Sequence, residues 1–146
     1  MSSGYDSAVD RPELGFLLSR LMREVMAREK PILEAAGLEM WDYAVLTALA
    51  ESDAPTQAQL AATTGRDKTR LIGNLDRLEA EGMVERQPDP ADRRNRIVSL
   101  TPAGSRVLAR CRNAIAAMET ELLADLDPGD RAGFERALTS LAEAGR

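Results

Sequence analysis

The order of three neighbouring segments constrains the fold of this chain more than any other feature of its sequence. Residues 67–81 show the apolar spacing of a helix, and two short runs of alternating apolar and polar residues follow at 83–86 and 96–100. Such alternation is typical of paired strands, and the turn that joins the runs is rich in Pro, Asp and Arg. We therefore predict a β-hairpin, or wing, over residues 83–100, directly after a helix.

A second helix pattern lies just before this segment. Thr56 has the position of an N-cap for a short helix that ends at Gly65, and Asp67 has the same position for the helix at 67–81. Two helices joined through a glycine-containing turn form a helix-turn-helix unit. With the hairpin after it, the predicted fold is mainly α: a winged helix-turn-helix with a two-stranded β wing.

Helical apolar stripes flank this unit on both sides. The stripe that starts at Leu14 predicts a long first helix that ends or bends at Pro31, followed by a short piece that closes at Gly37. Thr101 and Asp127, each followed by proline, are expected to cap two further helices. The predicted organisation is a single domain over residues 1–146, with a winged-helix lobe at 39–100 and N- and C-terminal helical regions at 14–36 and 102–144.

Composition narrows the possible functions. The 146 residues include no histidine and a single cysteine, Cys111, so the usual general base, Ser-His and Cys-His arrangements and most zinc or iron ligands are missing. We therefore expect no enzymatic activity, no metal and no cofactor. The sequence lacks an apolar run of membrane-spanning length and an apolar signal region, which predicts a cytoplasmic protein without a membrane partner.

The helix at 67–81 is the first candidate binding surface. On a helical wheel its polar side carries arginines, an amide and a glycine, and lies opposite a leucine-rich side. A guanidinium group can read guanine in the major groove of DNA, and a carboxamide can read adenine. An ordinary solvated helix face is the alternative. The predicted DNA-binding residues on this polar side are Arg70, Gly73, Asn74 and Arg77.

The turn of the hairpin is the second candidate surface. Arg93, Arg94 and Arg96 cluster there, although the chain has a net charge of −5. A loop arginine can reach the negative potential of a minor groove, and Asp92 can pair with Arg94 and fix its rotamer. A solvated hairpin tip, or arginine abundance from GC-rich codons, would explain the same residues without function. The two surfaces in this order favour duplex DNA as the partner.

The residues of the wing also carry a family resemblance. The stretch DRRNRIVSLTPAG, residues 92–104, resembles the wing signature of the MarR (multiple antibiotic resistance regulator) family, and residues 67–86 resemble its recognition helix and first wing strand. The resemblance implies that Asp92 and Arg94 form the family's Asp-x-Arg pair. It also implies that Lys68, Thr69 and Arg70, at the start of the recognition helix, contact DNA. Two departures are Gly73, where many members carry Arg, and Asn95, where a small residue is common.

The resemblance implies an assembly and a mode of regulation. It predicts a homodimer built from the regions 14–36 and 102–144, acting as a repressor that a small aromatic or phenolic ligand releases from a palindromic operator. An effector-independent regulator and a winged-helix protein-interaction module are the alternatives. Core filling is the alternative role for the predicted ligand-binding residues, and a buried thiol rather than a redox sensor is the favoured role for Cys111. The predicted ligand-binding residues are Met22, Met26, Trp41 and Tyr43.

Overall fold

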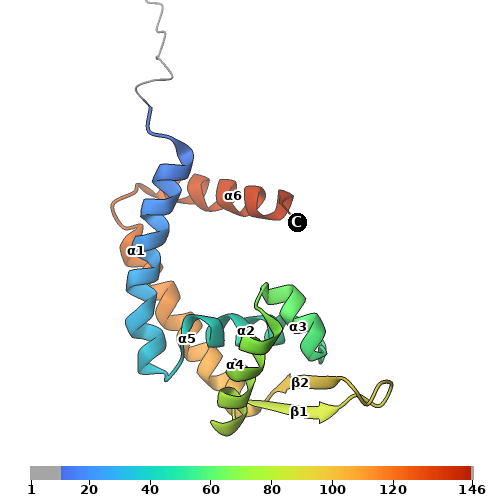
Figure 1. Ribbon diagram of the computed structural model, residues 1–146. Helices are drawn as coiled ribbons and strands as arrows, with labels where there is room; N and C mark the ends of the chain where they lie inside the picture. The colour runs from blue at the N-terminus through green and yellow to red at the C-terminus, as the bar shows by residue number, and fades with distance from the viewer. Residues whose placement is uncertain (1–10, 146) are drawn as a thin grey trace, which may run out of the picture.

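The computed structural model describes residues 11–145 and contains six helices and one two-stranded sheet among them (Figure 1). The mainly α winged helix-turn-helix fold predicted from the sequence is therefore confirmed. The elements are α1 Leu14–Ala35, α2 Met40–Glu51, α3 Gln57–Thr64, α4 Lys68–Ala80, β1 Val84–Pro88, β2 Arg96–Leu100, α5 Pro102–Leu122 and α6 Pro128–Ala144.

Local side-chain caps explain where four of the helices begin. Each of the four predicted capping residues accepts a hydrogen bond from the backbone N–H three residues ahead, which satisfies one of the free donors of the first turn. These donor–acceptor distances are 3.2 Å at Thr56, 3.2 Å at Asp67, 3.0 Å at Thr101 and 2.9 Å at Asp127.

The first helix differs from the prediction at Pro31. We expected the helix to end or bend there, but α1 runs through Pro31 without a break as far as Ala35. A proline inside a helix removes one backbone donor. The stop comes instead at Gly37, whose φ of 73° lies in the left-handed region that glycine adopts freely.

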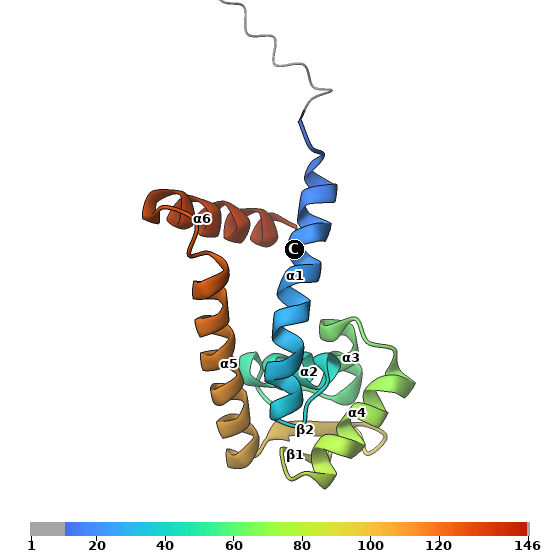
Figure 2. The same ribbon diagram turned by 90° about the vertical axis from the view of Figure 1, so that its left-hand side faces the viewer.

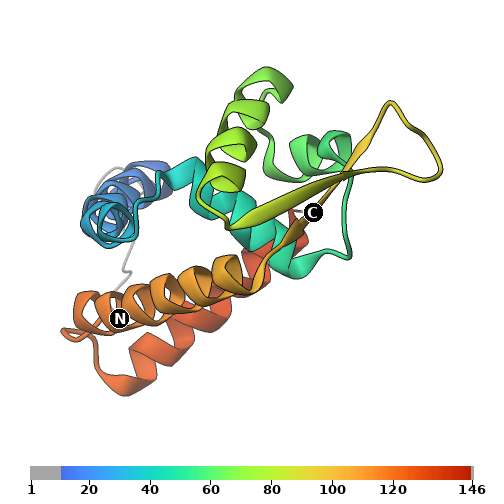
Figure 3. The same ribbon diagram turned by 90° about the horizontal axis from the view of Figure 1, so that it is seen from below.

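A single apolar core holds α2, α3 and α4 against the sheet. Its most deeply buried side chains come from α2 at Leu46, from α4 at Leu71 and Leu75, and from the wing at Val84 and Val98. Seen from below, the wing extends from this core and projects beyond every helix (Figure 3). The leucine-rich side of α4 is thus turned inward, which leaves its opposite side for a partner.

The wing is an antiparallel hairpin that is tied to the rest of the lobe at its base. The register pairs Val84 with Leu100 and Pro88 with Arg96. On the other side of β2, the Val98 N–H donates to the carbonyl of Pro55 at 2.9 Å, just before α3. This third segment holds the base of the hairpin in place while its tip remains free.

The helices at the two ends of the chain form a second region. α5 packs against α1, and α6 leaves the end of α5 at a steep angle (Figure 2). Large apolar side chains of α1 and α6 remain exposed, and α6 contributes no buried residue. No helix within residues 11–145 has the length and apolar character needed to cross a membrane.

Cys111 lies inside α5 and is 2% exposed. Burial raises the pKa of its thiol above the usual value, although nearby Arg110 acts in the opposite direction. A higher pKa leaves less thiolate at neutral pH, and the thiolate is the form that oxidants and alkylating agents attack. The position therefore favours a structural thiol over a redox sensor.

Candidate nucleic-acid interface

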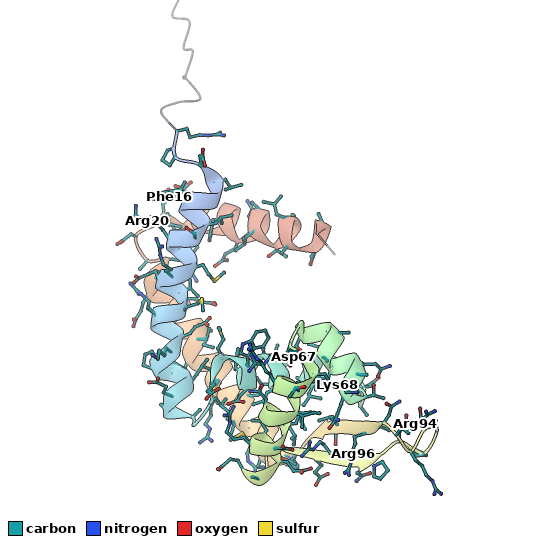
Figure 4. All side chains as sticks on the ribbon, in the orientation of Figure 1. Phe16, Arg20, Asp67, Lys68, Arg94 and Arg96 are labelled. Atoms are coloured by element: carbon teal, nitrogen blue, oxygen red, sulfur yellow. The ribbon has the colours of Figure 1, made fainter. Side chains whose placement is uncertain are left out.

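The N-terminal half of α4 presents the exposed basic surface that the sequence predicts. Lys68, Thr69, Arg70 and Gly73 are all exposed, and Asp67 caps the helix at its start (Figure 4). A methyl group added at Gly73 would meet no atom within 4 Å. The helix can therefore approach a groove closely at Gly73, because no side chain stands out from its surface there.

Asn74 does not lie on this surface, and the prediction that it does was wrong. Its side chain is 2% exposed, and its Nδ2 donates to Oδ1 of Asp42 at 2.7 Å. Asn74 follows Leu71 by three positions and precedes Leu78 by four, so it borders the apolar side of the helix. A polar partner on α2 draws it into the interior.

Arg77 is half-exposed, but its guanidinium group is engaged with two carboxylates of the same chain. Its Nη2 lies 2.7 Å from Oδ1 of Asp42 and 3.3 Å from Oε2 of Glu39. The hydrogen bond with Asp42 is the main cause that raises the pKa of Arg77 above its usual value. The structure therefore directs this predicted DNA-binding residue toward α2.

Arg66, in the turn between α3 and α4, contacts Trp41 and Asn74, and the sequence did not predict these contacts. Its guanidinium carbon lies 4.5 Å from the centre of the Trp41 ring, and its Nε donates to Oδ1 of Asn74 at 3.2 Å. An arginine stacked on an aromatic ring gains a cation–π interaction. Trp41 of α2 thus packs against the turn between α3 and α4.

Arg86 ties the wing to α4. Its Nη2 lies 2.6 Å from Oδ1 of Asp76 and 3.0 Å from Oε1 of Glu79, both on α4. The hydrogen bond from Arg86 lowers the pKa of Glu79, so this carboxylate stays charged over a wider range of pH. Arg86 therefore connects strand β1 to α4, whereas Arg93, Arg94 and Arg96 of the wing are exposed.

The turn of the wing holds its arginines outward. Arg94 lies at the tip of the hairpin with a side chain that is 93% exposed, and Arg93 and Arg96 are exposed as well (Figure 4). Oδ1 of Asp92 accepts hydrogen bonds from the Arg94 backbone N–H at 3.1 Å and from its Nε at 3.5 Å. The predicted pairing of Asp92 with Arg94 is therefore present. Asn95 adds a contact to the same carboxylate at 3.5 Å.

The predicted ligand-binding residues do not come together. A cavity of 390 Å³ lies between α1 and the start of α2, and of the four predicted residues only Met26 lines it. Met22 is exposed on α1, Trp41 stacks on Arg66, and Tyr43 packs against the core. The lining residues of the cavity are Met26, Ala27, Glu29, Lys30, Leu33, Glu34, Leu38, Glu39 and Met40.

Comparison with known proteins identifies the family. The sequence profile of the MarR family matches residues 36–95. The transcriptional regulator HosA of Escherichia coli O111:H- is 31% identical over 111 residues, which cover 76% of this chain and 82% of HosA. The chain belongs to the MarR family.

Solved structures of other regulators share the MarR fold over most of this chain. The transcriptional repressor CouR, solved bound to a 23-mer DNA duplex, has a TM-score of 0.78 and 28% identity, with 92% of this chain and 93% of CouR covered. BpsR of Bordetella bronchiseptica has a TM-score of 0.73 and 25% identity, with 89% of this chain and 93% of BpsR covered. The BpsR structure addresses the regulation of its DNA binding by 6-hydroxynicotinic acid.

These comparisons confirm the MarR resemblance drawn from the wing signature. The chain is a DNA-binding transcriptional regulator, and the relatives it matches are regulators and not enzymes.

Proposed function

We propose that this protein is a homodimeric repressor that binds a palindromic operator. A small aromatic or phenolic ligand releases the repressor from this DNA. The observation that carries the proposal is the outward placement of Arg93, Arg94 and Arg96 on a projecting wing (Figure 3), together with the exposed basic N-terminal half of α4. The chain as a whole has a net charge of −5. A local basic surface on an acidic protein selects a polyanion at that surface alone.

α4 is the reading helix in this proposal. Its exposed N-terminal half enters the major groove, where Arg70 reads a base edge and Lys68 and Thr69 contact phosphates. The wing reaches the adjacent minor groove through Arg94, with Asp92 limiting the rotamers of that arginine before binding. Arg93 and Arg96 add phosphate contacts.

A second copy of the chain completes the DNA-binding unit. Leu14, Leu17 and Leu18 of α1 and Leu138 and Leu141 of α6 are exposed in the single subunit. A concentration of large exposed apolar side chains is typical of an interface between proteins. A two-fold dimer through this surface places the two α4 helices in successive major grooves, about 34–36 Å apart, on a palindromic site. The repressor CouR, solved bound to a DNA duplex, supports the binding of duplex DNA.

The cavity between α1 and α2 is the proposed ligand site. Its volume of 390 Å³ lies within the range of small-molecule sites, about 300–1,000 Å³. Three carboxylates, Glu29, Glu34 and Glu39, surround it together with Lys30, and burial raises the pKa of Glu29. Glu34 lies 3.9 Å from Lys30 and Glu39 lies 3.3 Å from Arg77, so their charges are matched. The remaining carboxylate, Glu29, favours a neutral phenol over an aromatic carboxylate. The regulation of BpsR by 6-hydroxynicotinic acid supports control by a small aromatic compound.

Selection of bound duplexes from a random DNA pool, read by sequencing, tests the core of the proposal. We expect enrichment of an inverted repeat whose half-sites are about one helical turn apart. An effector-independent regulator would give the same motif. A protein-interaction module would enrich no motif and would show no salt-dependent affinity for duplex DNA.

The wing gives a direct test of the DNA contacts. Arg94→Ala is expected to weaken binding to the selected site by about 1–3 kcal/mol, because a groove contact is lost and the exposed side chain has no role in the core. Fluorescence anisotropy at fixed salt measures the change. Arg106→Ala, which removes an exposed arginine of α5, is the matched control and should leave the affinity nearly unchanged. Equal affinities of the two variants would contradict the role of Arg94.

Ligand titration tests the release from DNA. Phenols and aromatic acids are added to the protein–DNA complex while Trp41 emission and DNA binding are followed together; Trp41 is the single tryptophan of the chain. A coupling of about 1–3 kcal/mol lowers DNA affinity roughly 5–150-fold. We expect phenols to change both signals over one concentration range, at lower concentrations than the acids. A full panel without either effect would favour the effector-independent alternative.

A further inference from the structure

Asp42 and Asn74 are the two buried polar side chains among residues 11–145, and they belong to one hydrogen-bonded cluster. Asp42 is 1% exposed and Asn74 is 2% exposed. A buried carboxylate is costly unless hydrogen bonds and an opposite charge compensate for the lost water. Such a group therefore specifies the arrangement of its partners more strictly than an apolar contact does.

The partners of Asp42 come from two helices. Its Oδ2 accepts from the Glu39 backbone N–H at 2.9 Å, which closes the first turn of α2. Its Oδ1 accepts from Nδ2 of Asn74 and from Nη2 of Arg77, each at 2.7 Å, and both of these donors lie on α4. One carboxylate thus joins the start of α2 to the middle of the reading helix.

The cluster continues to the turn before α4. Oδ1 of Asn74 accepts from Nε of Arg66, and Arg66 in turn stacks on Trp41, the neighbour of Asp42 on α2. Two successive residues of α2 therefore hold both the turn that leads into α4 and the middle of α4. Leucines of α4 bury its apolar side, but apolar contacts are non-directional and permit small rotations of a helix about its axis. The hydrogen bonds to Asp42 are directional and restrict such rotations.

We propose that Asp42 is a positioning residue that sets the rotation of α4 in the DNA groove and thereby the sequence discrimination of the protein. The inference rests on the proposed role of α4 as the reading helix. Base readout needs side chains at defined positions, whereas attraction to phosphates does not depend on sequence. A less firmly held α4 should therefore lose base readout and keep its attraction to phosphates.

Arg77 makes this difference measurable. In the wild type its charge is matched by Asp42 and Glu39. Asp42→Asn keeps the size of the side chain but removes the charge opposite Arg77, so the variant gains positive charge beside the DNA surface. Affinity for unrelated DNA should therefore stay equal or rise while affinity for the operator falls.

The test compares dissociation constants for the selected operator and a scrambled duplex at one salt concentration. For Asp42→Asn we expect the ratio of the two constants to fall by about ten-fold or more, a loss comparable to that of one good base contact. Asp76→Asn is the matched control, because it makes the same charge change at an exposed carboxylate of α4. Arg86 keeps Glu79 as a partner in that variant, so the ratio should stay within about three-fold of wild type.

The outcomes separate the inference from the proposed function. A wild-type protein without sequence preference would overturn both. A wild-type preference that Asp42→Asn retains, or a loss of affinity by the same factor on both duplexes, would overturn the positioning role alone. If Asp42→Asn does not fold, Arg77→Met carries the test, because Arg77 is half-exposed and the apolar core stays intact. The same loss of discrimination is then expected, and retention of the ratio would overturn the inference.

Discussion

Gly104→Ala is expected to destabilise the protein by about 3 kcal/mol, the upper end of the usual cost of overpacking. A Cβ atom at this position would lie 2.0 Å from the carbonyl oxygen of Met83 and 2.9 Å from its carbonyl carbon. Both atoms belong to the main chain, so no side chain can rotate away to make room. Thermal unfolding followed by circular dichroism should show a melting temperature lower by roughly 10 °C.

The obstruction lies at the junction between the wing and α5. The Met83 carbonyl accepts from the Thr101 backbone N–H at 3.1 Å, and the Thr101 hydroxyl donates to the carbonyl of Gly82. A shift of α5 away from Met83 would therefore strain these bonds as well. The glycine that closes the LTPAG stretch thus has a physical reason, which is the close approach of α5 to the chain before β1.

Gly73→Ala is the matched control for this prediction. An added methyl group at Gly73 meets no atom within 4 Å. Alanine also restricts the unfolded chain and favours a helix, so the substitution should stabilise the protein by about 0.5–1 kcal/mol. Equal melting temperatures for the two variants would contradict the prediction that a side chain at position 104 cannot be accommodated beside Met83.

Features set by neighbouring residues could be predicted from the sequence. Thr56, Asp67, Thr101 and Asp127 cap their helices because a capping bond spans three residues and needs no distant partner. The wing followed from alternation and turn residues, which are equally local. The exposure of the arginines at the tip of the wing could also be predicted, because a protruding turn does not contact the core.

Features that depend on a distant partner could not be predicted in this way. A helical wheel places Asn74 at the border of the apolar side, and the decision for the interior comes from Asp42, which is 32 positions away. The same carboxylate draws Arg77 inward. The family resemblance placed Trp41 in a ligand cleft. Its stacking partner Arg66 could be found only once α2 and the turn before α4 were placed together.

The double substitution Leu17→Glu with Leu141→Glu is expected to abolish the proposed dimer and most of the DNA affinity. Leu17 of α1 and Leu141 of α6 are 46% and 69% exposed in the single subunit, so glutamate at either position can remain in water while the subunit is monomeric. In the dimer these charges would be buried without a partner, which is strongly unfavourable. Sedimentation velocity at micromolar concentration should show a monomer with native helical content.

Met40→Glu is the control for the charge change. Met40 is 48% exposed at the start of α2, outside the surface formed by α1 and α6, so the variant should remain a dimer. A stable dimer of the double variant would place the subunit interface elsewhere.

The DNA affinity of the double variant separates loss of the dimer from loss of the reading surface. A dimer holds its second α4 at a high effective concentration near the second half-site, which strengthens operator binding by about 10²–10⁴-fold over a single half-site. The monomeric variant keeps α4 and the wing but lacks this gain. It should therefore bind the full operator and an isolated half-site with nearly equal, weak affinity, whereas the wild type should strongly prefer the full operator. A monomer that still prefers the full operator would show that the two half-sites are not read by two joined subunits.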